Sequence, residues 1–202
     1  MHFRSIQRIL GLLLMASSCT MVPPLVIALW MDEASKSVFP VAMSAVLVTG
    51  LVFWYPVRRY RHELRIRDGF VIVSLFWAVL ALAGAVPFSL SEQPQMSFTD
   101  AMFESMSGLT TTGATVLTGL DEMPKSLLYY RQQLQWLGGM GIIVLAVAVL
   151  PMLGVGGMQL YRAEIAGPVK DTKLTPRITE TAKALWYIYL GLTVACGVAY
   201  YY

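Results

Sequence analysis

Long stretches without a charged residue alternate with short charged segments along this chain of 202 residues. A membrane-spanning helix needs about 17 to 25 mostly apolar residues, because each residue rises only ~1.5 Å through a hydrocarbon layer ~30 Å thick. Five uncharged stretches meet this length, at residues 9–31, 37–57, 69–91, 132–161 and 184–202. The pattern therefore predicts an all-α integral membrane protein with roughly five transmembrane helices.

A sixth uncharged stretch, residues 105–120, is shorter and rich in serine, threonine and glycine. Just before it, Ser97 and Asp100 are spaced to cap a helix, since the serine accepts from first-turn amides and the carboxylate suits the positive helix end. A helix over 98–109 rises about 18 Å, roughly half of the hydrocarbon layer. It can enter the membrane but must turn back, so the sequence predicts a re-entrant pore helix followed by a loop over 110–115.

The loop over 110–115 would place non-helical backbone at membrane depth, which is tolerated only where protein or a water-filled path satisfies its polar groups. The consecutive threonines favour extended backbone, and Gly113 can adopt the positive φ that turns a carbonyl inward. Rows of carbonyls can replace the water around a dehydrated cation, and the negative end of the preceding helix points at the same place. The loop is therefore predicted to be an ion filter. The alternative from the same residues is a polar extracellular turn.

Composition and charge distribution support a membrane protein with a defined orientation. Hydrophobic residues make up 56% of the chain and charged residues 13%, against about 25% charged in an average soluble domain. Twelve of the 15 Lys and Arg residues fall at the N-terminus and in the loops at 56–68 and 154–183. The positive-inside rule places these three regions in the cytoplasm. Topology explains the arginine-rich loop better than nucleic-acid binding does, and no nucleic-acid partner is expected.

The ionisable residues offer no arrangement for catalysis or for a structural metal. His2 lies at the terminus and His62 in the arginine-rich loop, without Asp, Glu or Cys at ligand spacing. Cys19 and Cys196 fall inside predicted spans with no spacing partner, which favours packing roles. The chain is therefore not expected to be an enzyme, and no bound cofactor is expected.

Two further sets of residues flank the predicted filter. Asp100 and Glu104 lie one turn apart on the pore helix, where they can concentrate cations at the outer mouth. Alternatively, they satisfy the helix N-terminus and pair with Arg131. The next helix contains three glycines, Gly138, Gly139 and Gly141. Glycine permits close helix approach in membranes, and a bend beside the pore is the alternative role.

Three motifs occur in order along the chain: FESMSGLTTTGAT at 103–115, QWLGGMG at 135–141 and GGMQLYRAE at 156–164. Together they resemble the Trk/Ktr family of potassium transporters. Three separated motifs are far more specific than the threonine loop alone, and the resemblance runs along the whole chain.

The resemblance implies a channel-like fold, in which four helix, pore-loop, helix repeats of one polypeptide surround a potassium path and an extra helix pair precedes them. It implies that Gly113 is the filter glycine of the first repeat, and that carbonyls of Thr111, Thr112 and Gly113 bind potassium, the transported substrate. It also implies a channel-like transporter or symporter of the bacterial inner membrane, in contact with lipid. The partners implied are a second copy in a homodimer of the full-length protein and a cytosolic nucleotide-binding ring of TrkA type.

On this plan the chain divides into a helix pair, a basic cytoplasmic loop, a first repeat, a second cytoplasmic loop and the first helix of a second repeat. The corresponding ranges are 1–57, 58–68, 69–153, 154–183 and 184–202. Only one pore-loop unit is present and the sequence ends within an apolar segment, so it is expected to be part of a longer protein. The alternative function is a non-conducting structural or scaffold subunit of a membrane transport complex. The choice of potassium over sodium rests on the resemblance.

Overall fold

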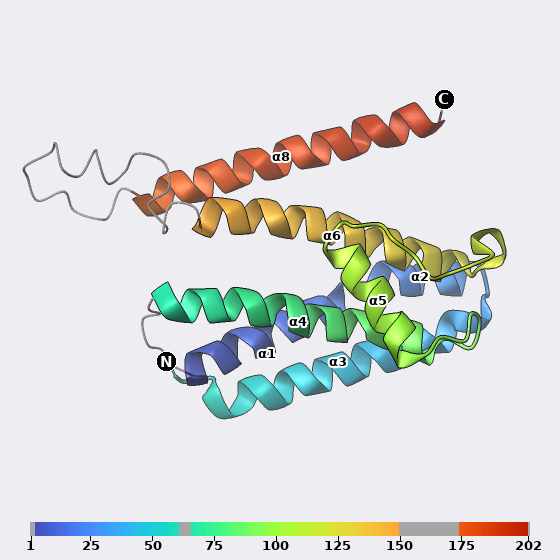
Figure 1. The fold of residues 1–202 in the computed structure, drawn as a ribbon, viewed down its shortest axis with the longest axis horizontal. Helices are drawn as coiled ribbons and strands as arrows, with labels where there is room; N and C mark the ends of the chain where they lie inside the picture. The colour runs from blue at the N-terminus through green and yellow to red at the C-terminus, as the bar shows by residue number, and fades with distance from the viewer. Residues whose placement is uncertain (1–2, 61–65, 150–173, 202) are drawn as a thin grey trace, which may run out of the picture. The chain divides into compact units, whose positions relative to one another are not determined.

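The computed structural model describes residues 3–60, 66–149 and 174–201, which are mainly helical (Figure 1). In chain order the helices are α1 (Phe3–Cys19), α2 (Val22–Trp30), the short 3-10 helix η1 (Ala34–Ser37), α3 (Val38–Trp54), η2 (Tyr55–Val57), α4 (Ile66–Leu90), α5 (Phe98–Leu109), η3 (Leu120–Glu122), α6 (Lys125–Val149) and α8 (Leu174–Tyr201). The chain forms two units, Met1–Gly138 and Gly139–Tyr202. Much of the predicted loop at 154–183, and part of the arginine-rich loop, lie outside the described residues.

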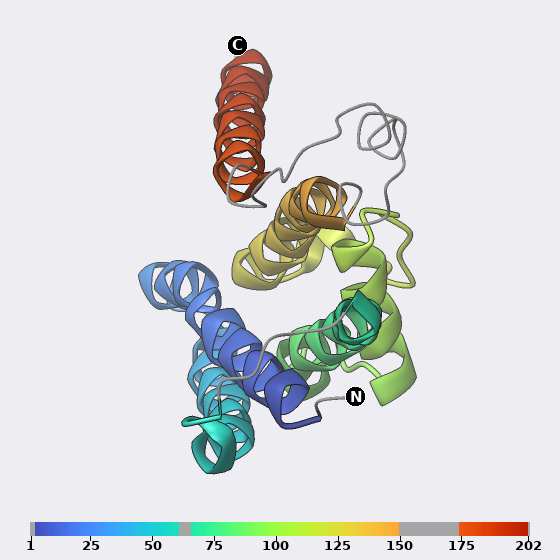
Figure 2. The ribbon, with the colours of Figure 1, turned by 90° about the vertical axis from the view of Figure 1, so that its left-hand side faces the viewer.

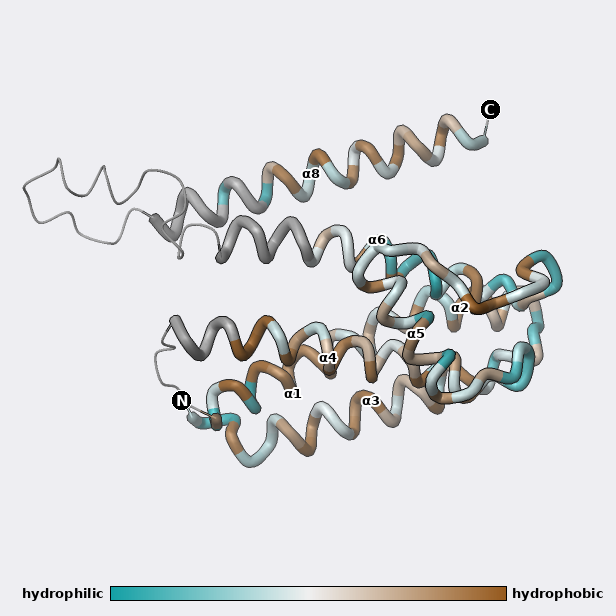
Figure 3. Tube along the Cα trace, viewed as in Figure 1, coloured by the Kyte–Doolittle hydropathy of each residue, from teal (hydrophilic) through white to brown (hydrophobic). Residues whose placement is uncertain are grey.

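Four helical stretches of the described residues are long and apolar enough to cross a membrane: Phe3–Trp30, Ala34–Val57, Val71–Leu90 and Lys183–Tyr201. They coincide with four of the predicted spans, and α6 corresponds to the fifth. Large apolar side chains lie on their outside, since Val48, Val52 and Ile188 are 57%, 64% and 58% exposed. Figure 3 shows hydrophobic residues along α3 and hydrophilic ones gathered in the turns. This surface suits hydrocarbon rather than water, and the predicted all-α membrane fold is confirmed.

The first predicted span, at residues 9–31, consists of two helices and not of one. α1 ends at Cys19, and α2 begins at Val22 with Pro23 in its first turn. Proline has no amide proton and its ring clashes with the preceding turn, so it is favoured where a helix starts and breaks one that would continue. Met21 fills the break and is only 1% exposed.

α4 ends at Leu90, close to the end of the predicted span at 69–91, and continues through Pro87. Pro87 lies within the last turn, where few hydrogen bonds remain to be lost. α8 begins at Leu174, inside the predicted loop at 154–183, whereas its apolar, membrane-length part is Lys183–Tyr201. Hydrophobicity marks the part of a helix that can lie in hydrocarbon, and a helix can extend beyond it.

Glycines hold α1 and α3 against each other, and Figure 2 shows the two helices side by side. A β-carbon on Gly11 would lie 2.8 Å from the Trp54 amide nitrogen, and one on Gly50 would lie 3.0 Å from the Gly11 carbonyl oxygen. Small residues let backbones approach closely where lipid removes any hydrophobic drive between helices. The extra helix pair is therefore joined by backbone contact.

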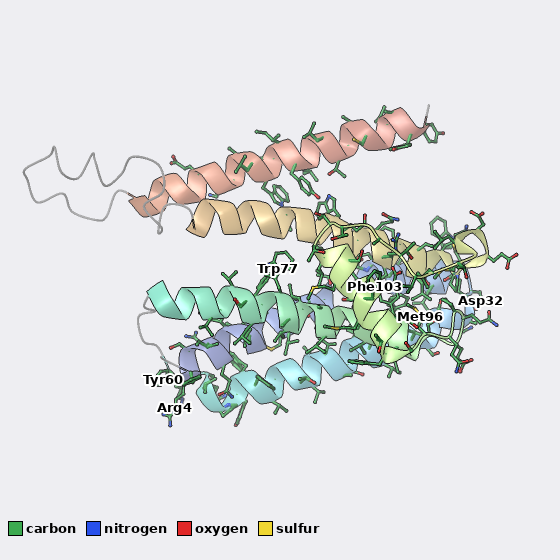
Figure 4. The ribbon with its side chains drawn as sticks, in the orientation of Figure 1. Arg4, Asp32, Tyr60, Trp77, Met96 and Phe103 are labelled. Atoms are coloured by element: carbon green, nitrogen blue, oxygen red, sulfur yellow. The ribbon has the colours of Figure 1, made fainter. Side chains whose placement is uncertain are left out.

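The ends of this first unit differ in charge. Arg4 and Tyr60 lie at one end and Asp32 at the other (Figure 4). The Arg4 guanidinium is 5.6 Å from the centroid of the Tyr60 ring, and Arg8 donates to the Tyr60 carbonyl at 3.3 Å. The N-terminus and the start of the arginine-rich loop thus share one end of the unit. The side of the membrane that this end faces stays a prediction.

The turn between α2 and η1 is joined to the start of α6. Glu33 accepts hydrogen bonds from the amides of Lys125 and Ser126 at 2.6 and 3.2 Å, and from the Ser126 hydroxyl. The carboxylate satisfies amides that the first turn of α6 leaves unpaired, and its charge suits the positive helix end. Burial acts to raise the pKa of Glu33, but hydrogen bonds from Ser126, Ser35 and the Lys125 amide hold that pKa below its ordinary value.

We expect Glu33→Gln to lower the free energy of unfolding of the full-length protein at pH 7 by roughly 1 kcal/mol, which is typical for loss of a helix cap. The folded-state pKa of Glu33 is depressed, so the carboxylate's contribution is present above the ordinary value of 4.5 and is lost as the pH falls through the folded value. The difference between wild type and variant should therefore shrink in acid. Melting curves in detergent at pH 7 and pH 4 measure it, with Asp32→Asn as the neighbouring control. Equal melting temperatures at pH 7 would contradict the capping role.

Candidate functional site

The segment predicted to be re-entrant begins with α5, which runs from Phe98 to Leu109 as predicted. The Ser97 hydroxyl accepts from the Asp100 amide at 3.1 Å and donates to the Asp100 carboxylate at 2.7 Å. The predicted cap is confirmed. Asp100 thus occupies the positive first turn, one of the two roles that the sequence allowed for it.

Close backbone contacts pack α5 against α4 and α6. A β-carbon on Gly108 would lie 3.1 Å from the Leu134 β-carbon, and one on Gly138 would overlap the Leu109 carbonyl group. On α4, a β-carbon at Gly84 would overlap the hydroxyl of a buried serine of α5. The close approach predicted for Gly138 is confirmed, and it places the last turn of α5 directly on α6.

The other two glycines of this helix lie in the second unit. A β-carbon on Gly139 would lie 2.6 Å from the Tyr189 hydroxyl, which is a packing contact with α8. α6 runs unbroken over Lys125–Val149 and so passes through Gly141 without a break. A hinge at these positions stays a prediction.

The chain does not become extended directly after α5. Thr110 has φ −82° and ψ 3°, Thr111 has φ 57° and Gly113 has φ 74°. The expectation of extended threonines is therefore wrong for Thr110 and Thr111. The reason is that the amides of Thr111 and Thr112 bond back to carbonyls of the last turn of α5, both at 3.0 Å. The turn is wrapped over the end of the helix.

Two residues of this turn have left-handed backbone. The positive φ expected at Gly113 is confirmed, and glycine adopts it at no steric cost. Thr111 is branched at its β-carbon, and a side chain of this kind at positive φ costs on the order of 1 to 3 kcal/mol. Strain of this size persists only where surrounding contacts impose it, and it is concentrated at functional sites. The contacts around Thr111 must therefore impose this conformation on it.

Glu104 ties the returning limb of the loop to α5. Its carboxylate accepts from the Thr115 hydroxyl at 2.6 Å and from the Val116 amide at 2.7 Å. It also forms an ion pair with Arg131 of α6, whose Nε lies 2.9 Å away. Glu104 is 1% exposed and Arg131 7%. The pairing with Arg131 that the sequence allowed is confirmed, and Glu104 is not an exposed charge.

Side chains also bind the carbonyls at the far end of the turn. Arg131 Nη2 donates to the Gly113 carbonyl at 3.1 Å, and the Ser107 hydroxyl donates to the Ala114 carbonyl at 2.6 Å. In the part of the chain that the structure describes, no donor bonds the carbonyls of Thr111 and Thr112, and both residues are exposed. Neighbouring free carbonyls at the negative end of a helix are the groups that can replace water around a cation.

The family model for TrkH, described as a cation transport protein, matches residues 34–202 of this chain. The chain belongs to the TrkH family. It is 62% identical over 201 residues to the Trk system potassium uptake protein TrkH of Vibrio parahaemolyticus. It is 57% identical over 202 residues to the protein of the same name from Salmonella typhimurium. The crystal structure of the potassium transporter TrkH from Vibrio parahaemolyticus matches with a TM-score of 0.85 and 54% identity, over 100% of this chain and 40% of that one.

These TrkH proteins are longer than the chain. The chain spans 41% of the length of the Vibrio protein and 42% of the length of the Salmonella protein. The TrkH match supports the all-α membrane fold predicted from the sequence.

Three features of the candidate site were not predicted from the sequence. These are the strained φ of Thr111, the Ser107 bond to the loop and the Arg131 bond to Gly113. The sequence marks all three residue types as polar within an apolar region, and that was the only available signal.

Proposed function

We propose that this chain is part of a potassium-transporting membrane protein and that its loop at 110–115 supplies one quarter of a selectivity filter. The observation that carries the proposal is the pair of free carbonyls, on Thr111 and Thr112, held at the negative end of a half-length helix. Gly113 follows these two residues, and its positive φ sets the direction of the backbone in the same filter segment. The relatives are named for potassium uptake, which supports potassium as the substrate.

The proposal also covers the location and the partners of the full-length protein. The full-length protein acts in the bacterial inner membrane as a homodimer, with a cytosolic nucleotide-binding ring of TrkA type at its cytoplasmic face. The basic loops at 58–68 and 154–183 are on the side predicted to be cytoplasmic, which is the side on which such a ring would meet them. Asp100, half-buried near the start of α5, is the remaining candidate for an outer-mouth charge.

Transport by the purified full-length protein tests the proposal against the scaffold alternative. We expect liposomes that contain only this protein to take up rubidium or potassium ions, and we expect sodium ions to compete weakly. A scaffold subunit would require another membrane protein for any flux. Uptake no faster than in empty liposomes, from protein shown to be folded, would favour the scaffold.

Orientation has its own test, in which two cysteines are placed at opposite ends of the first unit. In the full-length protein with Cys19, Cys196 and any further cysteine replaced by serine, we expect Asp32→Cys to react in intact cells with a membrane-impermeant thiol reagent. Arg59→Cys should react only after the cells are opened, because twelve of the 15 cations gather on its side. Both positions are exposed. The reverse labelling pattern would overturn the topology.

A further inference from the structure

The buried pair of Glu104 and Arg131 is not explained by a role at the outer mouth of a pore. Both side chains are almost completely shielded, at 1% and 7% exposure. Removing two charges from water carries a large desolvation penalty, so a buried ion pair is weak support for stability by itself. A role in holding a particular local structure is therefore the better explanation, and the contacts around the pair show which structure that is.

The pair of Glu104 and Arg131 binds the loop over residues 113–116. The Glu104 carboxylate receives the Thr115 hydroxyl and the Val116 amide on one oxygen and Arg131 Nε on the other. The second arm of the same guanidinium reaches the Gly113 carbonyl at 3.1 Å. Arginine can make both bonds because its donors form a rigid planar fork. One rigid group therefore joins the pore helix, the next helix and the turn.

This geometry bears on which carbonyls can face a cation. A carbonyl oxygen that accepts from a guanidinium already has a positive charge beside it, so a metal cation at the same oxygen would be repelled. The carbonyls of Thr111 and Thr112 have no such donor among the described residues. The strained φ of 57° at Thr111 lies in the same part of the turn, where the amides bond back to α5 but the carbonyls accept no bond from the described residues.

We infer that Arg131, positioned by Glu104, withholds the Gly113 carbonyl from the ion path, so that the cation is bound by the carbonyls of Thr111 and Thr112. Arg131 and Glu104 are then positioning residues that set ion selectivity without touching the ion. This differs from the expectation, drawn from family resemblance, that all three carbonyls line the path. The inference rests on the proposed function.

Arg131→Lys is the sharpest test, because it keeps the positive charge and removes the fork. A lysine ammonium is a single point and cannot hold both the Glu104 carboxylate and the Gly113 carbonyl in the observed geometry. We expect the ratio of potassium to sodium affinity in liposome uptake to fall by on the order of tenfold, as for loss of one charge-assisted hydrogen bond. The exposed ion pair of Asp32 and Lys36 supplies the control, and Asp32→Asn should leave the ratio unchanged.

A second variant covers the case in which Arg131→Lys fails to fold. Glu104→Gln combined with Arg131→Gln leaves no buried charge unpaired, so folded protein should be recovered, while the fork is still absent. We expect this double variant to show the same loss of selectivity at normal abundance. Folded Arg131→Lys or double variant with wild-type selectivity would overturn the inference. The proposed function can survive that result, and it does so if Gly113→Ser changes selectivity in the same assay. If the wild-type protein transports nothing, the proposed function itself fails.

Discussion

Gly113→Ser should raise the potassium concentration needed for half-maximal uptake by on the order of tenfold and weaken the rejection of sodium. Gly113 has φ 74°, a region in which a β-carbon costs about 1 to 2 kcal/mol. Among the described residues, a β-carbon there would meet the Gln135 side chain alone, at 4.0 Å, so the effect comes from backbone strain and not from a clash. Relief of that strain rotates the neighbouring carbonyls, and each 1.4 kcal/mol of lost preference is a tenfold change in binding.

The chain offers two matched controls for this substitution. Gly119 also has positive φ, 66°, and no atom of the described residues lies within 4 Å of a β-carbon built there. Gly119→Ser therefore applies a similar strain outside the filter segment and should leave selectivity unchanged. Thr112→Val keeps the carbonyl and the β-branch but loses the hydroxyl, which lies 2.8 Å from the Thr110 hydroxyl. It should be milder than Gly113→Ser.

Uptake is measured for the full-length transporter in cells that lack other potassium importers, with the amount of protein measured alongside. Selectivity should change before abundance does, because the loop lies outside the packed helices. Unchanged potassium affinity and sodium rejection by Gly113→Ser at normal abundance would show that the loop is a plain turn.

Gly138→Ala should have the opposite profile, with a large loss of folded protein. A β-carbon at Gly138 would overlap the carbonyl of Leu109 at the end of α5. Backbone cannot move aside as the tip of a flexible side chain can, so α5 and α6 would have to separate. Overpacking of this kind costs about 1 to 3 kcal/mol and occasionally more. Because the filter turn begins directly after Leu109, any protein that folds should also have lost selectivity.

Melting temperature and yield in detergent, for the full-length protein, measure the effect of Gly138→Ala. Gly197→Ala is the matched control, since a β-carbon at this helical position of α8 meets no described atom within 4 Å. Alanine is also the better helix former, by about 1 kcal/mol, so the control should be neutral or slightly stabilising. A Gly138→Ala protein as stable as wild type would mean that α5 and α6 lie further apart than in this structure.

The re-entrant helix shows how far local sequence could lead. Its start follows from Ser97 and Asp100, and its length of 12 residues set it apart from the spans. The wrapped form of the turn could not be anticipated in the same way. β-Branched residues favour extended backbone when nothing else acts on them, whereas bonds to the last turn of α5 and the hold of Arg131 on Gly113 impose left-handed backbone on Thr111.

Glu33 illustrates the same limit over a longer distance. Its carboxylate caps α6 at Lys125, far along the chain. Nothing near Glu33 in the sequence distinguishes it from Asp32, which pairs with Lys36 one turn away. The break between α1 and α2 has a local signal in the sequence, because Pro23 marks the start of α2.

The sequence by itself determined the helices of membrane-spanning length and the half-length helix α5 with its cap, and it predicts the side on which the cations gather. These depend on hydrophobic length, on capping and on the charges of neighbouring loops, which are properties of contiguous residues. Only the tertiary structure decided that Glu104 pairs with Arg131, that Arg131 takes the Gly113 carbonyl, and that the carbonyls of Thr111 and Thr112 are left free. Those outcomes depend on which helices pack within hydrogen-bonding distance, because a buried polar group must find its partner wherever the fold places one.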